Sequence, residues 1–256
     1  MKNKLLVVGT MAYDAIETPH DKVDRILGGA ATYIALASSK FDVDCGLVSV
    51  IGDDFEDNDL KILTDLEIDI EGVEQVAGEK SFFWSGKYHD DMNGRTTLET
   101  QLNVLENFSP NVPNSYRNAE VMMIGNLHPG VQLTALNQMN RKSKFVILDT
   151  MNFWMDHFRE TLDKVIGRVD LITINDEEAR QLSEEHSLVK AAEKIHAMGP
   201  KYVIIKKGEH GAMLFGEGKV YLPDQKSMYV GGQVFMEGLG WLGAPFLFSG
   251  NIGANL

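Results

Sequence analysis

The stretch that decides the fold is FVILDTMNFWMDHFRETLDKVIGRVDLITIN, residues 145–175. It begins with an apolar run, Phe145 to Asp149, and ends with a second one, Leu171 to Asn175, each as long as a buried strand. Between the two runs, Phe153 to Val169 carries apolar residues at helical spacing. A strand, a helix and a strand in this order indicate a βαβ unit, whose two strands lie parallel in one sheet.

The same alternation continues on both sides of this stretch. We predict further buried strands at Leu5 to Gly9, Cys45 to Ile51, Val121 to Gly125 and Tyr202 to Lys206. We predict further helices at Gly29 to Ser39, Asp54 to Asp65 and Leu188 to Met198. The pattern therefore predicts an α/β fold with a mostly parallel sheet, whose functional groups lie at the carboxyl edge of the strands.

One segment departs from this alternation. Residues 81–88, SFFWSGKY, and residues 95–100, RTTLET, are rich in β-formers and are joined by a linker that contains Asn93-Gly94, a strong hairpin signal. Phe82, Trp84 and Tyr88 fall on one face of this hairpin. We expect it to stand off the main sheet as a small lid, although a plain surface hairpin is the alternative.

Composition limits the class of protein. The chain has 256 residues, of which 44% are hydrophobic and 24% charged, and its net charge of −13 gives no footprint for nucleic-acid binding. We expect no membrane segment and a cytoplasmic location, because no apolar run is long enough to span a bilayer and the first strand starts at once. Cys45 stands alone and the seven histidines lack metal-binding spacing, so a zinc site is not expected.

Five motifs follow one another along the chain. They are GTMAYD at 9–14, LGGAATY at 27–33, VIGDDF at 50–55, NDEE at 175–178 and IKKGEHG at 205–211. In this order, over residues 1–222, they resemble the ribokinase-like (PfkB) family of carbohydrate and nucleoside kinases. The resemblance implies a three-layer α/β/α sandwich with a β-sheet lid, in which residues 12–26 and 81–103 supply the lid strands.

The first two motifs resemble the part of the family that binds the acceptor. There Asp14 would accept hydrogen bonds from sugar hydroxyls, and Gly28 and Gly29 would let the ligand approach the start of a helix with unpaired N–H groups. Many relatives carry Asn where Tyr33 stands, which implies a small difference in the substrate. In the third motif Asp54 is predicted mainly to cap the following helix.

The last two motifs resemble the part that binds ATP and Mg²⁺. Asn175 and Glu178 would act on the metal and the phosphates, with Glu178 reaching Mg²⁺ through water. Lys206, Gly208 and Gly211 would flank the nucleotide. Taken alone, 175–178 would be a helix cap and the two glycines a hairpin turn.

Four polar residues at strand or lid ends are further candidates. Asn103 and Asn126 are placed with the acceptor, and Asp149 and Asn152 with the nucleotide, while loop capping is the alternative for each. The expected partners are a small sugar or nucleoside and ATP, and the exposed edge of the lid could pair two copies as a homodimer.

The tail differs from the rest of the sequence. Residues 229–256 contain seven glycines, no Lys, Arg or Asp and only one acid, Glu237, and we expect this atypical tail to replace the catalytic and adenine-binding region that follows residues 1–228. The family's GAGD turn, whose Asp acts as base, is absent, so no catalytic residue is assigned and the chain is expected to be truncated or of low activity. GLGWLG at 238–243 fits a dinucleotide fingerprint but lacks its strand, helix and later acid.

These observations predict a PfkB-type sugar kinase that uses ATP and Mg²⁺. A nucleoside kinase is the first alternative, favoured if Tyr33 and the lid aromatics stack on a base. A pseudokinase that binds its ligand without phosphorylating it is the second.

Overall fold

The computed structural model describes residues 3–90, 95–140, 142–221, 229–230 and 233–234. In this part of the chain the main sheet has nine strands in the order β13-β12-β11-β10-β9-β8-β1-β4-β5. Their bounds are β1 Asn3–Val8, β4 Val43–Gly52, β5 Asp69–Val76, β8 Val121–Ile124, β9 Phe145–Asp149, β10 Leu171–Asn175, β11 Tyr202–Lys206, β12 Ala212–Gly216 and β13 Lys219–Tyr221.

The sheet is parallel from β5 to β11, and β12 and β13 add two antiparallel strands at one edge. The six predicted strands correspond to β1, β4, β8, β9, β10 and β11, so these predictions are confirmed. Three further strands, β5, β12 and β13, extend the sheet at its two ends.

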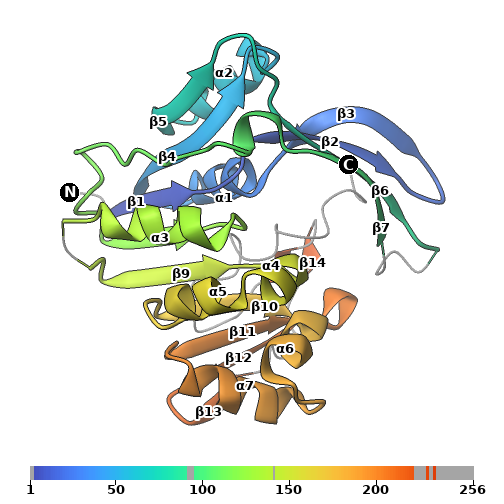
Figure 1. Cartoon of the computed structure of the whole chain (residues 1–256), viewed down its shortest axis with the longest axis vertical. Helices are drawn as coiled ribbons and strands as arrows, with labels where there is room; N and C mark the ends of the chain where they lie inside the picture. The colour runs from blue at the N-terminus through green and yellow to red at the C-terminus, as the bar shows by residue number, and fades with distance from the viewer. Residues whose placement is uncertain (1–2, 91–94, 141, 222–228, 231–232, 235–256) are drawn as a thin grey trace.

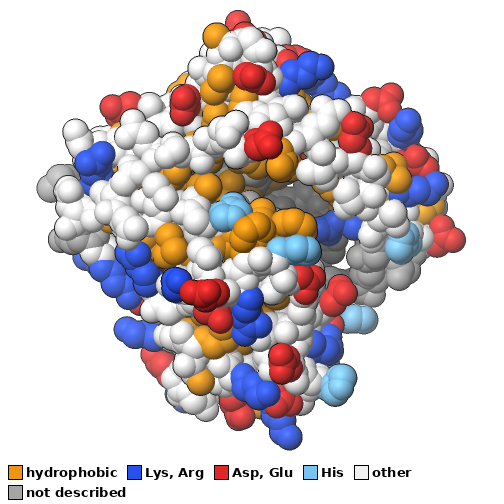
Figure 2. All heavy atoms as spheres, in the orientation of Figure 1, with side chains coloured by type: hydrophobic (Ala, Val, Ile, Leu, Met, Phe, Trp, Pro, Cys, Tyr) orange, Lys and Arg blue, Asp and Glu red, His pale blue; other side chains and the backbone are white. Residues whose placement is uncertain are grey.

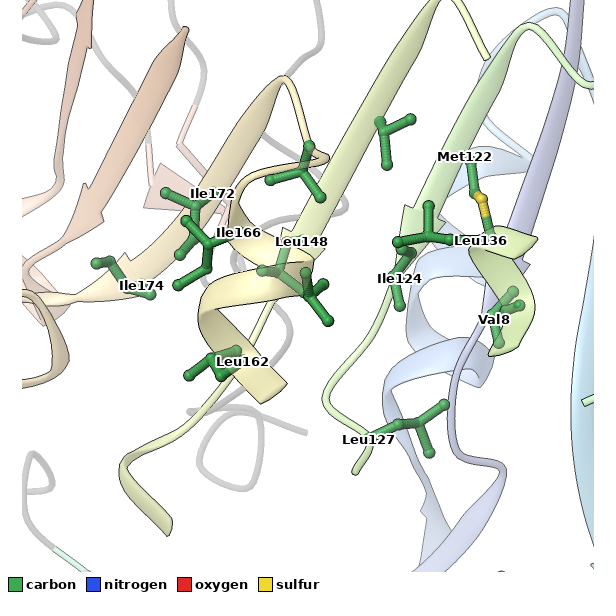
Figure 3. Packing of buried hydrophobic residues seen from close by; sticks show 14 of the residues in the cluster. Val8, Met122, Ile124, Leu127, Leu136, Leu148, Leu162, Ile166, Ile172 and Ile174 are labelled. Carbon is green, nitrogen blue, oxygen red and sulfur yellow. The ribbon is translucent and has the colours of Figure 1, made fainter. Parts of the chain in front are cut away.

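Helices cover both faces of the sheet (Figure 1). Five lie on one face, namely α3 Pro129–Asn137, α4 Asn152–His157, α5 Arg159–Ile166, α6 Asp176–Ser183 and α7 Leu188–Ala197. The other face carries α1 Ala30–Ser38 and α2 Asp57–Asp65. Figure 3 shows how Leu162 and Ile166 of α5 pack on Leu148, Ile172 and Ile174 of the sheet. No helix among the described residues is long and apolar enough to cross a bilayer.

The single helix predicted at 153–169 is wrong, because the segment forms two helices, α4 and α5. The break is at Phe158, whose backbone leaves the helical region at φ −134° and ψ 30°. The Phe158 ring lies edge-on to His128, with 4.4 Å between ring centroids, and packs 5.6 Å from Trp154. Packing of this half-buried ring against other aromatic groups accompanies the loss of helical continuity.

The lid is a separate four-stranded sheet in the order β3-β2-β6-β7. It combines two hairpins, β2 Ala12–Glu17 with β3 Lys22–Gly28 and β6 Phe82–Tyr88 with β7 Arg95–Gln101. The two hairpins join through a parallel pairing of β2 with β6. Figure 1 shows this sheet beside the main sheet, so the hairpin at 81–100 belongs to a lid and is not an isolated surface hairpin.

Polar contacts fasten the lid to the main domain near α2. The Tyr13 hydroxyl donates to Asp59 Oδ2 at 2.6 Å, and the Arg25 guanidinium lies over the Tyr13 ring, 3.7 Å from its centroid. Asp54 does not cap α2, because Glu56 is the N-cap residue; instead Asp54 Oδ1 accepts a hydrogen bond from the Ser81 amide at 2.6 Å. Asp54 therefore holds the start of β6, and its predicted capping role is wrong.

Candidate functional site

The candidate site lies between the lid and the carboxyl edge of the main sheet. In register, Val8 of β1 pairs with Ile124 of β8, and Ile124 pairs with Leu148 of β9. The residues that follow these three strands therefore lie level with one another at the carboxyl edge of the main sheet. Asp149 ends β9, and Asn175 and Lys206 are paired at the ends of β10 and β11.

On the side predicted to bind the acceptor, Asp14 lies in the lid strand β2 next to Gly28 of β3. A Cβ atom on Gly28 would lie 2.4 Å from Asp14 Oδ2 and 2.5 Å from its Cγ, so only glycine leaves room for this carboxylate. Burial raises the pKa of Asp14 to about 6, an effect that the charge of Arg95 partly offsets. The structure thus brings the predicted residues Asp14 and Gly28 into direct contact.

Gly29 is the N-cap residue of α1 and has φ 94°, a conformation that favours glycine. The amides of Ala30 and Ala31 donate to Oγ1 and to the backbone oxygen of Thr10, at 3.0 and 2.9 Å. The expectation that these first amides of α1 are unpaired is therefore wrong. Thr10 was not recognised from the sequence, where it reads only as a small residue after a strand.

Two tyrosines, Tyr33 and Tyr88, lie within electrostatic reach of Asp14. The Tyr33 hydroxyl donates to the backbone oxygen of Leu27 at 2.9 Å. Burial, together with the smaller effect of the Asp14 charge, raises the pKa of Tyr33 to about 12. Burial also raises the pKa of Tyr88, and Arg95 and Asp14 are the charges that act on it.

The lid aromatics share the face of Asp14. Asp14 pairs with Trp84 in the parallel register of β2 and β6, and paired side chains project to the same face. Along β6, Trp84, Gly86 and Tyr88 alternate onto that face, and a Cβ atom on Gly86 would lie 2.0 Å from the Trp84 ring. The indole therefore covers Gly86 and lies flat along the lid.

On the side predicted to bind phosphates, Asn175 and Glu178 form a reciprocal capping box at the start of α6. Asn175 Oδ1 accepts from the Glu178 amide and Glu178 Oε2 accepts from the Asn175 amide, both at 2.7 Å. Burial raises the pKa of Glu178 to about 7, against lowering effects that include the charges of Lys206 and Arg95. The helix-cap interpretation of this motif is thus confirmed, and the carboxyl group still lies near two cations.

Asp149 and Lys206 lie next to this capping box. Lys206 Nζ is 3.5 Å from Asp149 Oδ1, and the Asp149 side chain is only 2% exposed. Gly208 and Gly211 both have positive φ, 55° and 82°, and form the tight turn between β11 and β12. The turn interpretation of these glycines is therefore confirmed.

The three asparagines have partners within the protein. Asn103 has φ 47° and donates to the backbone oxygen of Ser81 at 2.8 Å, so it holds the base of the lid. Asn126 accepts from Trp154 Nε1 at 2.7 Å, and Asn152 donates to Gln181. For Asn103 and Asn126 the structure shows the alternative that was left open, a loop-supporting role.

Sequence reasoning also missed Gln132 and Arg95. Gln132 is fully buried and donates to the backbone oxygens of Gly125 and Asp149 at 2.9 and 3.3 Å, which ties the ends of β8 and β9 together. Arg95 is the first residue of β7, and its charge acts on both Asp14 and Glu178. No local motif signals either residue, because their partners are distant in sequence.

Hydrophobic and histidine side chains gather near the middle of the helical face, beside a hollow in the surface (Figure 2). An aromatic cluster lies on this side of the sheet, made of His128 at the start of α3, Phe153, Trp154 and His157 of α4, and Phe158 between α4 and α5. Among the described residues, no group of three or more His, Cys, Asp or Glu is arranged to hold a metal ion.

Two known proteins with similar sequences are named as a cytidine kinase and a nucleoside kinase. The chain is 28% identical over 215 residues to a cytidine kinase of Thermococcus kodakarensis, which covers 82% of this chain and 75% of that protein. It is 22% identical over 242 residues to a nucleoside kinase of Methanothermobacter thermautotrophicus, which covers 83% of this chain and 72% of that protein.

Solved structures with the same fold include the nucleoside kinase of Methanocaldococcus jannaschii, with a TM-score of 0.68, 19% identity and coverage of 91% of this chain and 81% of that one. The ribokinase of Arabidopsis thaliana, solved with ribose and ATP, has a TM-score of 0.69, 16% identity and the same coverage of both chains. These likenesses confirm the ribokinase-like α/β fold with its lid.

The family model described as pfkB family carbohydrate kinase matches residues 2–230. This match spans both sheets and all five motifs. The chain therefore belongs to the pfkB family of carbohydrate kinases, a family of phosphotransferases.

Proposed function

We propose that this chain binds ATP and a nucleoside, and that the acceptor group is a hydroxyl of the nucleoside's sugar. The observation that carries the proposal is the Asp14 carboxylate, which Gly28 accommodates and which faces the lid aromatics. An ionised carboxylate has two oxygens that accept hydrogen bonds from vicinal hydroxyls, as a sugar requires. Family membership supports this class of acceptor.

The aromatic groups around Asp14 favour a nucleoside over a free sugar. Trp84 pairs with Asp14 in register, and Tyr33 and Tyr88 lie within electrostatic reach of it. A base offers a flat apolar face to such rings, which a free sugar lacks, and ring pairs add about 0.5–1.5 kcal/mol beyond their buried area. The names of two relatives, a cytidine kinase and a nucleoside kinase, agree with this choice. A simple sugar is the second candidate, because family membership supports it equally.

The phosphate side fits ATP with a largely hydrated Mg²⁺. The Asn175 amide donates to Glu178 Oε2, so the other carboxylate oxygen of Glu178 would be left to contact a metal-bound water. Mg²⁺ in such a site would be bound mainly by the phosphates and water. When bound, Mg²⁺ would neutralise phosphate charge, while Lys206, Gly208 and Gly211 would border the nucleotide.

Turnover is proposed to be low, because no GAGD sequence occurs in the chain and the last aspartate is Asp224. In the family this motif supplies the base, and its place in this chain corresponds to the tail, most of which is outside the described residues. This sequence feature also supports the pseudokinase alternative. Dimerisation through the lid stays a prediction, with β3 and β7 as the edge strands of that sheet.

Thermal shift measurements test the proposal. Cytidine, adenosine, ribose and fructose are added separately, with and without ATP and Mg²⁺. We expect a nucleoside to raise Tm more than either sugar does, and Asp14→Asn to abolish the shift. Asp65→Asn, on an exposed side chain paired with Lys61, is the matched control and should keep it. A coupled ATP assay then separates the enzyme from the pseudokinase, and rapid turnover would show that the tail supplies a base. If none of the four compounds shifts Tm, the proposal is wrong.

A further inference from the structure

Arg95 lies on the ligand-facing side of the lid. It pairs with Tyr88 across the β6–β7 hairpin, and Tyr88 shares a face with Trp84 and Asp14. The Arg95 guanidinium is 5.7 Å from the centroid of the Trp84 ring, which agrees with this placement. The register of three lid strands thus directs one cation toward the site.

The charge of Arg95 acts on Asp14, whose pKa it lowers against the larger effect of burial. On the main sheet, Lys206 already pairs with Asp149. Figure 1 shows the β6–β7 hairpin reaching from the lid toward the elements that follow β10 and β11.

An anionic group placed beside Asp14 would be repelled by this carboxylate unless a cation also faced it. A guanidinium suits this task, because its planar fork binds two oxygens of a phosphate at once. The group that has to lie there, if the proposed function holds, is the phosphate newly attached to the acceptor hydroxyl.

We propose that Arg95 binds the phosphate of the phosphorylated product, a nucleoside or sugar phosphomonoester. This inference rests on the proposed function and adds a residue and a ligand class to it. Arg95 holds the phosphate oxygens through charge-assisted hydrogen bonds and exchanges no proton. The lid then distinguishes the phosphorylated product from the unphosphorylated acceptor.

Calorimetric titration with two pairs of probes tests the proposal. The pairs are cytidine with cytidine 5′-monophosphate, and ribose with ribose 5-phosphate. Arg95→Gln should weaken binding of the phosphomonoester by about 10- to 100-fold, the effect of losing hydrogen bonds to a charged group. Binding of the unphosphorylated partner should stay within threefold. The affinity of Arg95→Lys for the phosphomonoester should lie between those of wild type and Arg95→Gln, because lysine keeps the charge but cannot bind two phosphate oxygens with a planar guanidinium.

Lys87→Gln is the matched control. Lys87 is a lid cation that follows Gly86 in β6, so its side chain lies on the face opposite to Trp84 and Tyr88. There it pairs with Glu17 at 2.6 Å. The Lys87→Gln substitution should change neither affinity. Equal weakening of both members of a pair by Arg95→Gln, or no weakening, would overturn the proposal. So would a wild-type protein that binds cytidine or ribose but neither phosphomonoester, an outcome that leaves the proposed function intact.

A second readout does not depend on ligand. In carboxyl NMR titrations, Arg95→Gln should raise the pKa of Asp14, while Lys87→Gln should leave it unchanged. If the pKa of Asp14 stays unchanged in Arg95→Gln, the guanidinium does not face the site and the inference fails, whatever the substrate is. If wild-type protein binds none of the four probes, the proposed function fails and takes the phosphate role of Arg95 with it.

Discussion

The two sides of the site are built in different ways. On the acceptor side, Asp14 sits in a space left by Gly28, and burial dominates its pKa. On the phosphate side, Glu178 is bonded to the Asn175 amide and Asp149 is paired with Lys206, so these carboxylates already serve the fold. The Asp14 carboxylate is thus held in a space that Gly28 leaves open, whereas Glu178 and Asp149 already have partners in the fold and would add a binding role only under the proposed function.

The largest expected effect comes from filling that space. In Gly28→Ala the added methyl would meet Asp14 Oδ2 at 2.4 Å, so the carboxylate has to move. We expect acceptor binding to fall by at least about 100-fold and stability to fall by about 1–3 kcal/mol, the usual cost of overpacking. Titration with the acceptor that shifts Tm measures the first effect and urea unfolding the second. Gly78→Ala, with positive φ but no atom within 4 Å of the new methyl, controls for loss of glycine itself. Unchanged acceptor affinity in Gly28→Ala would end the contrast between the two sides.

The second prediction concerns pH. Because the pKa of Asp14 is raised to about 6 and that of Glu178 to about 7, the folded state binds more protons than the unfolded state between about pH 4 and pH 7. Stability should therefore fall as pH rises through this window, by about 1.4 kcal/mol for each unit of pKa shift at most. Acceptor binding should strengthen over the same range, because it requires ionised Asp14. Urea unfolding at several pH values measures the slope, which Asp14→Asn and Glu178→Gln should each reduce. A wild-type slope that survives both substitutions would contradict this reasoning.

Glu178 allows its two roles to be separated. Glu178→Gln keeps an oxygen that can accept from the Asn175 amide but loses the charge. We expect ATP–Mg²⁺ binding to weaken by roughly tenfold, about 1.4 kcal/mol, with little loss of stability. Asn175→Ala removes the cap instead and should cost about 1 kcal/mol of unfolding free energy. Titration with ATP–Mg²⁺ and urea unfolding of both variants provide the comparison, and equal effects of the two variants on both measurements would show that the roles cannot be separated.

The smallest expected effect is at Asn126, which supports the loop after β8 by accepting from Trp154 Nε1. Asn126→Ala leaves Trp154 Nε1 without its partner and should cost about 1 kcal/mol of stability. Acceptor affinity should be unchanged, as a titration at a temperature well below Tm would show. A large loss of affinity would place Asn126 in the acceptor site after all.

Much of the fold could be predicted from the sequence, because its central strands are continuous apolar runs. The runs 145–149 and 171–175 are mostly apolar up to their last residue, as buried strands are, and the structure has strands with these same bounds. The break at Phe158 could not be predicted, since it accompanies contacts with His128, which lies thirty residues earlier in the chain.

The site was only partly predictable for the same reason. Asp14 and Gly28 stand in recognisable motifs, and the structure brings them together. Arg95 is one of several charged residues around a turn, and nothing local distinguishes it from Lys87. Only the pairing of β2 with β6 and of β6 with β7 decides which of the two cations faces the ligand.

The parallel pairing of β2 with β6 has a consequence for the order of folding. Residues 12–17 cannot pair with residues 82–88 until the intervening α1, β4, α2 and β5 have crossed over, since parallel strands require a long connection. Closing so long a loop costs conformational entropy, so we expect this pairing to form late in folding. During synthesis, β2 and β3 can form a hairpin early. The lid face that carries Asp14 and Trp84 is complete only after residues 82–88 have left the ribosome and β6 has paired with β2.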